Sequence, residues 1–483
     1  MNSFHDLDRI INYLFARDGV HCLCRRGRAR HVAVSPGEGT QAVEESAPTV
    51  RGIDPLERET MKRVAWRLMP LLVLGYFCAY LDRSNIGMAA PTMMPALGFS
   101  NAVFGFGAGL FFIGYFLAEI PINLMLNKFG ARRWIARIMI TWGIISGLTA
   151  FVWSDWSFYV IRLLLGLAEA GLYPGVILYL TWWFPAHYRT RAMSLFQSAS
   201  IISLIIGPLV GGLLLHLNGI LGLAGWQWLY IAEALPSIIM CSVIWQLLTD
   251  RPEQAAWLRP DQRTWLSQRL ASERAEREAI RKFSLAQALY NPKIWLLAVA
   301  YIGQNMVSYA LAFFMPLIVQ GLGVSTGMTG VVVALPYVFV LIAMNYWGWH
   351  SDFTGERLWH VSAAYLLCAA GLVACILIGH GHPILTMIAL TLALTGTQAI
   401  SPIFWALPSA MLTGAAAAAG IAMINAVGNL GGMIGPWVFG LVKDATGSDN
   451  LAVLALALAP VIAVILLQIV GHDRRMERLP PRA

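Results

Sequence analysis

Charged residues are scarce in this chain. Lys, Arg, Asp and Glu together make up 12% of its 483 residues, whereas hydrophobic residues make up 58%. Because a soluble globular protein carries about 25% charged residues, this composition excludes an ordinary soluble domain. The deficit extends from about residue 66 onward, and it predicts a protein that crosses a membrane many times.

The motifs of several enzyme classes are also missing. The sequence contains no Gly-x-x-x-x-Gly-Lys-Ser/Thr phosphate loop, no nucleophile elbow and no cluster with metal-ligand spacing. Its six cysteines form no disulfide framework, and four of them lie in apolar runs, where cysteine is usually a small core residue. We therefore expect neither an enzyme nor an ATP-driven pump, and we expect no metal and no cofactor.

The apolar residues form runs of roughly 20 residues, the length with which a helix crosses a bilayer. A helix satisfies its own backbone hydrogen bonds, so these runs predict helices rather than other spanning structures. We predict an all-α membrane protein with twelve transmembrane helices, at residues 66–89, 103–126, 133–153, 157–181, 190–214, 226–248, 292–318, 328–349, 359–379, 384–406, 417–441 and 450–471.

Lysine and arginine are missing from alternate loops. Segment 1–65 contains ten of them and segment 249–290 contains eight, and Lys443 is the one exception to the alternation. Basic loops stay on the cytoplasmic side of a membrane, so the pattern predicts that both termini are cytoplasmic. It also attributes the net charge of +8 to topology rather than to a nucleic-acid partner. The loops that lack basic residues are 91–102, 152–156, 215–225, 319–327 and 380–383.

Two parts of the chain repeat one pattern. The Gly-Pro pairs at 207–208 and 435–436 are 228 residues apart, and Gly130 and Gly355 are 225 residues apart. Two motif pairs at nearly one offset indicate an internal duplication. We therefore predict two pseudo-symmetric six-helix bundles at 61–248 and 291–471, a cytoplasmic linker at 249–290, and cytoplasmic tails at 1–60 and 472–483, the first of them disordered.

A short loop after the eighth predicted helix carries a family motif. Residues 348–357 read GWHSDFTGER, which resembles the Gly-x-x-x-Asp-x-x-Gly-x-Arg signature of the major facilitator superfamily. In the first-half copy, Asn123 and Asn127 replace the expected glycine and aspartate. We therefore expect a weaker acid–base contact between neighbouring helices at that loop. The resemblance implies two bundles that rock about a central site. It also implies that the gating residues are Lys128, Arg132, Arg133, Asp352 and Arg357.

Further strings resemble the anion:cation symporter family within that superfamily. They are YLDRSNIG at 80–87, GYFLAEIPIN at 114–123, GARRWIAR at 130–137, RLLLGLAEAG at 162–171, WWFP at 182–185 and GWQWL at 225–229. The resemblance extends over residues 55–471. It implies import of a small organic carboxylate, such as a tartrate, a phthalate or a hexuronate, usually driven by protons.

Six charged side chains lie in the apolar interiors of the predicted helices, five or more residues from either end, and all are in the first half. Charge in hydrocarbon is costly, so each is a candidate functional residue. Arg83 and Arg162 lie at similar predicted depths, and two guanidinium forks can bind a carboxylate in bidentate fashion. The alternative is that they only neutralise nearby carboxylates. The six residues are Asp82, Arg83, Glu119, Arg162, Glu169 and Glu233.

A carboxyl group is needed to carry a co-transported proton. Glu169 lies two helical turns from Arg162 on the same face, where burial favours its neutral form and the arginine its charged form. We predict that Glu169 couples the proton, with Asp82 as the second candidate or, alternatively, as a structural hydrogen-bonding residue. For Glu119 and Glu233 we favour structural roles.

Neutral polar residues replace charges in the second half. Such donors and acceptors suit the hydroxyl groups or ring atoms of an organic acid, although each one also fits interhelical hydrogen bonding. Beside the two arginines, the predicted substrate-binding residues are Tyr80, Tyr115, Gln304, Tyr309, Gln398, Ser401, Trp405, Asn425 and Asn429.

The leading hypothesis is a multi-pass secondary transporter of a bacterial inner (plasma) membrane. It imports a small organic anion with a proton, or with Na⁺ as the alternative cation, by alternating access, and it acts as a monomer in the lipid bilayer. The rival hypothesis is an exporter or anion exchanger, because GPLVGG at 207–212 resembles an antiporter signature. Ser203 departs from the glycine of that signature, and we interpret the string as close helix packing.

Overall fold

The computed structural model describes residues 54–279, 291–379, 381–405, 407–408 and 414–471. Most of the predicted tail 1–60 and all of the tail 472–483 lie outside these residues. Within them, twelve helical segments are long and apolar enough to cross a membrane, and each overlaps one predicted span. The prediction of an all-α membrane protein with twelve transmembrane helices is therefore confirmed.

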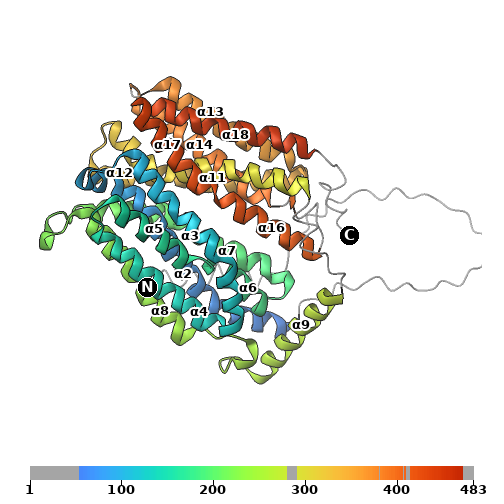
Figure 1. Ribbon diagram of the computed structural model, residues 1–483. Coiled ribbons are helices and arrows are strands. Elements are labelled where there is room, and N and C mark those ends of the chain that lie inside the picture. The colour runs from blue at the N-terminus through green and yellow to red at the C-terminus, as the bar shows by residue number, and fades with distance from the viewer. Residues whose placement is uncertain (1–53, 280–290, 380, 406, 409–413, 472–483) are drawn as a thin grey trace, which may run out of the picture.

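The helices follow one another with short connections (Figure 1). Helix α9 (Pro260–Ala279) lies in the predicted linker and packs against α2 and α6 of the first half. The first half contains α2 (Pro55–Leu97), α3 (Asn101–Phe129), α4 (Ala131–Leu148), α5 (Asp155–Glu169), α6 (Leu172–Trp183), α7 (Ala186–Leu215) and α8 (Gly225–Leu247). The second half contains α11 (Pro292–Gly321), α12 (Thr326–Thr354), α13 (Leu358–Ile378), α14 (Pro383–Phe404), α16 (Gly414–Asn429), α17 (Gly431–Thr446) and α18 (Asp449–Val470).

Two of the spans are interrupted. The predicted helix 157–181 is two helices, α5 and α6, because the chain bends at Ala170 and Gly171. Gly171 has φ of +85°, a conformation that suits glycine, and a Cβ there would collide with Ile122. The predicted helix 417–441 is likewise divided into α16 and α17 at Leu430. The first break places Glu169 at the very end of α5.

The molecule has two unlike ends. We call the end with α9 and the turns at 129–131 and 354–358 the linker end, and the opposite end the far end. At the far end, glycines bring helices of the first half and helices of the second half into backbone contact. A Cβ on Gly87 of α2 would lie 3.2 Å from the Cα of Phe313 in α11, and Gly330 of α12 lies against the backbone of Pro208 in α7. Helices α3 and α17 also pack together, so the halves are closed against each other at the far end.

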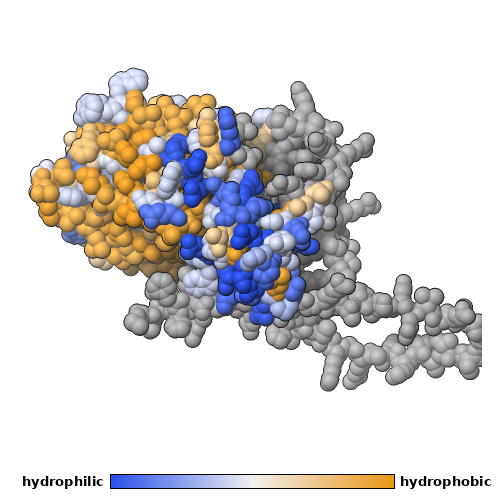
Figure 2. Space-filling model, turned by 90° about the horizontal axis from the view of Figure 1, so that it is seen from below, coloured by the Kyte–Doolittle hydropathy of each residue, from blue (hydrophilic) through white to orange (hydrophobic). Residues whose placement is uncertain are grey.

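The outer surface is apolar. Figure 2 shows hydrophobic residues over much of one side and hydrophilic residues gathered beside the linker end. Large side chains such as Leu377, Ile384 and Ile342 remain 80%, 78% and 66% exposed. Soluble monomers rarely expose apolar patches of this extent, and contact with lipid chains accounts for them.

Candidate functional site

An ion pair joins two helices of the first half in the middle of the molecule. Nε and Nη2 of Arg83 on α2 lie 2.8 Å and 2.6 Å from Oε1 of Glu169 on α5. Glu169 ends α5, and the C-terminal end of a helix carries partial negative charge that attracts a cation. The break after Glu169 thus creates a place where an arginine is favoured. Oε2 of Glu169 is buried and has no hydrogen-bond partner among the described residues.

Aromatic rings surround the Arg83 guanidinium. Its central carbon lies 5.1 Å, 5.3 Å and 5.4 Å from the ring centres of Tyr80, Phe111 and Tyr115, distances at which a cation interacts with a ring face. Tyr309 of α11 interacts electrostatically with Arg83 from the second half. Arg83 therefore lies where the two halves meet. The structure brings it together with three of the predicted tyrosines, and Phe111 was not predicted.

Arg162 also lies against the ring of Phe111. Its guanidinium carbon is 5.3 Å from the centre of that ring, and Nη2 donates a hydrogen bond to the carbonyl of Ala108 at 3.1 Å. The residue is 2% exposed. The two arginines are thus neighbours, as their predicted depths imply. One nitrogen of Arg162 is bound to a backbone carbonyl, while its buried Nε has no hydrogen-bond partner among the described residues.

Asp82 takes partners different from those of Arg83. Its carboxyl group accepts hydrogen bonds from Ser146 of α4 at 2.8 Å and from Asn85 at 3.2 Å. Neighbouring residues of a helix point about 100° apart, so Asp82 faces α4 and α8 while Arg83 faces α5. Ser146 was not predicted, because serines are common in membrane helices.

Apart from Tyr309, the predicted residues of the second half lie on or beside α11, α14 and α16. Gln304 of α11 donates to Oγ of Ser401 at 2.7 Å and to the carbonyl of Thr397 at 2.9 Å, both on α14. Trp405 packs against Tyr301, with ring centres 5.0 Å apart. Gln304 and Trp405 thus lie on adjacent helices. The partly buried Gln398 lies on α14, and Asn425 and Asn429 lie one turn apart on α16.

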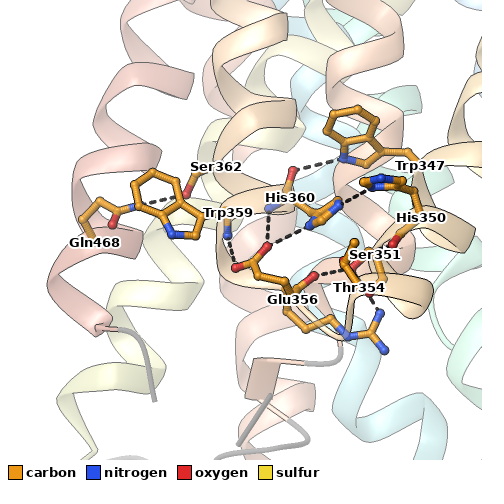
Figure 3. Close-up of polar contacts among 10 residues, drawn as sticks. Trp347, His350, Ser351, Thr354, Glu356, Trp359, His360, Ser362 and Gln468 are labelled. Atoms are coloured by element: carbon orange, nitrogen blue, oxygen red, sulfur yellow. Dashed lines mark hydrogen bonds and ion pairs between the residues drawn. The ribbon is translucent and has the colours of Figure 1, made fainter. Parts of the chain in front are cut away.

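The loop between α12 and α13, which carries the predicted family motif, is held by a series of hydrogen bonds (Figure 3). Glu356 accepts from the backbone N–H of Trp359 at 2.8 Å, which caps α13, and lies 2.8 Å from Nδ1 of His360. Nε2 of His360 is 2.8 Å from Nδ1 of His350 on α12. Arg357 donates to Ser351 at 3.3 Å. The side chain of the predicted gating residue Asp352 lies outside the described residues.

The first-half loop has an acid that sequence reasoning missed. Asp250, which follows α8, accepts a hydrogen bond from the backbone N–H of Arg132 at 2.7 Å and lies against Gly130. The expectation that this loop is weakened because Asn127 replaces the aspartate of the motif is therefore incomplete. A carboxylate that follows another helix, α8, caps α4 instead. The predicted gating residues Lys128 and Arg133 are exposed.

Comparisons with known proteins agree with this architecture. The family model described as Major Facilitator Superfamily matches residues 72–475. A "Putative tartrate transporter" of Agrobacterium vitis is 46% identical over 418 residues, covering 86% of this chain and 92% of the relative. A "Quinolone resistance transporter" of Acinetobacter baumannii is 38% identical over 416 residues, covering 86% of this chain and 95% of the relative.

A solved structure gives the same fold. The crystal structure of a bacterial homolog of the human lysosomal transporter Spinster, in an inward-facing and occupied conformation, superposes with a TM-score of 0.70 at 17% identity. The match covers 86% of this chain and 98% of that one. Among the described residues, no group of three or more His, Cys, Asp or Glu side chains could hold a metal ion. The chain is a member of the major facilitator superfamily of membrane transporters.

Proposed function

We propose that this protein imports a small organic anion together with a proton across a bacterial inner membrane. The name of the tartrate relative, at 46% identity over most of both chains, supports a hydroxylated carboxylate as substrate. The basic residues of segments 1–65 and 249–290 support a cytoplasmic linker end. With that orientation, the closed far end faces the outside of the cell.

The Arg83–Glu169 ion pair is the observation that carries this proposal. Two guanidinium nitrogens bind one carboxylate oxygen, Oε1, while Oε2 is buried and has no partner in the described part of the chain. A substrate carboxylate and Glu169 therefore compete for the same fork. Protonation of Glu169 removes its charge and frees Arg83 for the substrate. Proton binding and anion binding are thereby linked at one guanidinium.

The transport cycle follows from this competition. Outside, Glu169 takes a proton and Arg83 binds the substrate carboxylate, with the tyrosine rings on both halves closing around it. The bound site then carries less net charge, so the halves can rock past it. Inside, Glu169 releases its proton, recaptures Arg83 and displaces the anion.

Export is the second candidate function. It is supported by 38% identity to a protein named as a quinolone resistance transporter. The two candidates differ in direction and in cargo. A cell that expresses an exporter gains drug resistance, whereas a cell that expresses an importer gains uptake of a carboxylate.

Reconstituted vesicles test the import mechanism. Wild-type protein should accumulate radiolabelled tartrate or a related carboxylate when an inward proton gradient is imposed. Glu169→Gln should lose this accumulation and keep exchange of labelled for unlabelled substrate, because its amide cannot release a proton. Counterflow and gradient-driven uptake are measured on the same preparation.

Glu119→Gln is the matched control, since it removes a different membrane carboxyl group on α3. It should accumulate substrate like the wild type. If Glu169→Gln concentrates substrate against its gradient, the coupling role of Glu169 is wrong. If the wild type shows neither exchange nor accumulation of any small carboxylate, the substrate class is wrong.

A further inference from the structure

Four basic side chains gather at the linker end where α3 turns into α4, away from the central site. They are Lys128 at the end of α3, and Arg132, Arg133 and Arg137 in the first two turns of α4. Within the described part of the chain, none of the four forms an ion pair. The carboxylate of Asp250 at this turn accepts its hydrogen bond from the backbone N–H of Arg132. The turn therefore carries a surplus of positive charge.

Two aromatic rings position the cations of this turn. The guanidinium carbon of Arg137 lies 4.2 Å from the ring centre of Trp134. Trp134 in turn stacks on Phe129, with ring centres 5.5 Å apart, and Nζ of Lys128 lies 5.6 Å from the centre of Phe129. At these distances a ring face attracts a cation. The rings therefore fix where the positive charges lie without neutralising them.

The same turn contains hydrogen-bond donors that lack acceptors. Nε and Nη2 of Arg137, Nε of Arg132 and Nε1 of Trp134 are buried and have no hydrogen-bond partner among the described residues. All four atoms are N–H donors, and a buried donor without a partner costs free energy. Arg133 is exposed and Arg137 is partly buried, so a ligand reaches them from the surface of α4. The turn thus offers donors and positive charge to an anion.

The side of α4 that carries these arginines is apolar farther along the helix. Arg133, Arg137, Ile144 and Leu148 lie four or seven residues apart, so they share one side of the helix. Ile144 and Leu148 remain 49% and 48% exposed, whereas the buried residues of α4 pack against other helices such as α5 and α8. From Arg137 to Leu148 the helix rises about 16 Å. Half of the hydrocarbon core of a bilayer is about 15 Å thick, so this side of α4 spans one leaflet.

We propose that Arg133, Arg137 and Trp134 bind the headgroup phosphate of an anionic phospholipid in the leaflet at the linker end, with an acyl chain along Ile144 and Leu148. Guanidinium groups bind phosphate oxygens in bidentate fashion, and the indole N–H adds a donor. A free phosphate ion shares this chemistry, but the apolar side chains on the same side of α4 favour a ligand with a hydrocarbon tail. The inference goes beyond the proposed function, because it assigns a site on the lipid-facing surface that needs no transported substrate.

A bound headgroup would supply the negative charge that the first-half loop lacks. The family motif places an acid where this chain has Asn127, so the basic residues after it lack the carboxylate of the motif. The phosphate of a lipid takes the place of that carboxylate. Arg133, which the resemblance assigns to gating, then holds the turn at 129–131 against the leaflet, while Asp250 holds the backbone of the same turn beside the end of α8.

Native mass spectrometry of the purified full-length protein in detergent tests the site, because it counts bound lipids, and the tightest binding event is the one compared. Phosphatidylglycerol should bind at concentrations where phosphatidylcholine, whose headgroup has no net charge, binds little. Arg133→Gln and Arg137→Gln should each weaken phosphatidylglycerol binding about fivefold, the usual contribution of one arginine near an anionic surface. Arg137→Lys keeps the charge without the planar fork and should lie between Arg137→Gln and the wild type.

Arg269→Gln is the matched control, because it removes an exposed arginine of α9, and it should bind phosphatidylglycerol like the wild type. Equal binding by the wild type and by the variant that carries both glutamines would refute the site. Equal binding of phosphatidylglycerol and phosphatidylcholine by the wild type would also refute it, without reliance on any variant. If inorganic phosphate displaces the lipid at the concentration at which phosphatidylglycerol itself binds, the ligand is a free anion and the assignment to a lipid is wrong.

Discussion

At the scale of single residues, accessibility separates the two members of the central ion pair. The side chain of Arg83 is 15% exposed, whereas that of Glu169 is 2% exposed. An incoming anion therefore meets the arginine first. The planar fork matters as much as the charge, because Nε and Nη2 act together on one oxygen.

Replacement of Arg83 by lysine tests this geometry. Lysine keeps the positive charge but loses the planar pair of donor nitrogens, so it makes one of the two hydrogen bonds less well. A hydrogen bond to a charged group contributes about 1.5–3 kcal/mol. We expect Arg83→Lys to lower kcat/KM for carboxylate uptake by roughly 100-fold. Initial uptake rates in vesicles measure it. The control is Arg259→Lys, which changes an exposed arginine of the linker; uptake by Arg83→Lys at the wild-type rate would remove Arg83 from the binding site.

The sequence predicted these residues but not their pairing. Asp82, Arg83 and Glu169 stood out because charge inside an apolar run is costly. Which carboxyl group each arginine takes depends on how every helix is rotated about its own axis, and that rotation is set by packing against neighbours. Phe111 and Ser146 were missed for a related reason, since aromatic and hydroxyl side chains are ordinary in membrane helices.

At the scale of helices, a carboxylate fastens the two halves at the far end. Asp444 of α17 accepts hydrogen bonds from the backbone N–H groups of Asn101 and Ala102, at 3.2 Å and 2.7 Å, and from the Asn101 side chain at 2.7 Å. The first N–H groups of a helix lack partners within it. One half thus caps a helix of the other, and the cap is lost whenever the halves separate.

Removal of this cap should favour opening at the far end. A capping interaction contributes about 0.5–2 kcal/mol, so Asp444→Ala should shift the equilibrium by about 2- to 30-fold toward the open form. The measurement is the rate at which an impermeant maleimide labels a cysteine at position 433, where Met433 packs against Gly109. The matched control is Ser154→Ala, which removes the side-chain cap of α5 from within the first half. Equal rates in the two variants would contradict the proposed fastening.

The positions of the helices were predictable from the sequence, whereas the breaks within them were not. Runs of roughly 20 apolar residues locate a span because the bilayer demands that length. The break at Ala170 and Gly171 leaves no such signature, since the predicted span 157–181 has the length of one continuous helix. The break places Gly171 directly against Ile122 of α3, where a side chain on residue 171 would collide with it. This contact joins distant parts of the chain, so a local run of residues does not reveal it.

At the scale of the whole molecule, transport requires the far-end contacts to part in every cycle. Helices α7 and α12 belong to different halves, and a Cβ at Gly327 of α12 would lie 2.8 Å from Nε2 of His216 on α7. Cysteines at these two positions are therefore within reach of a short bifunctional thiol reagent.

Cross-linking this pair should stop transport. We expect His216→Cys with Gly327→Cys to lose nearly all uptake after treatment with a short bis-methanethiosulfonate reagent and to recover it when a reductant cleaves the link. Each single variant, treated in the same way, should keep its uptake. Undiminished transport by the cross-linked double variant would mean that the halves do not separate there.

The glycine contacts of the far end have a consequence for energy conservation. Gly105 lies directly against the backbone of Pro436, and Gly330 lies against that of Pro208. Backbone packed directly against backbone leaves no room for a chain of water molecules at these contacts. Protons therefore do not cross the closed far end along them. Glycine contacts of this kind prevent the transporter from dissipating the electrochemical gradient while no substrate is bound.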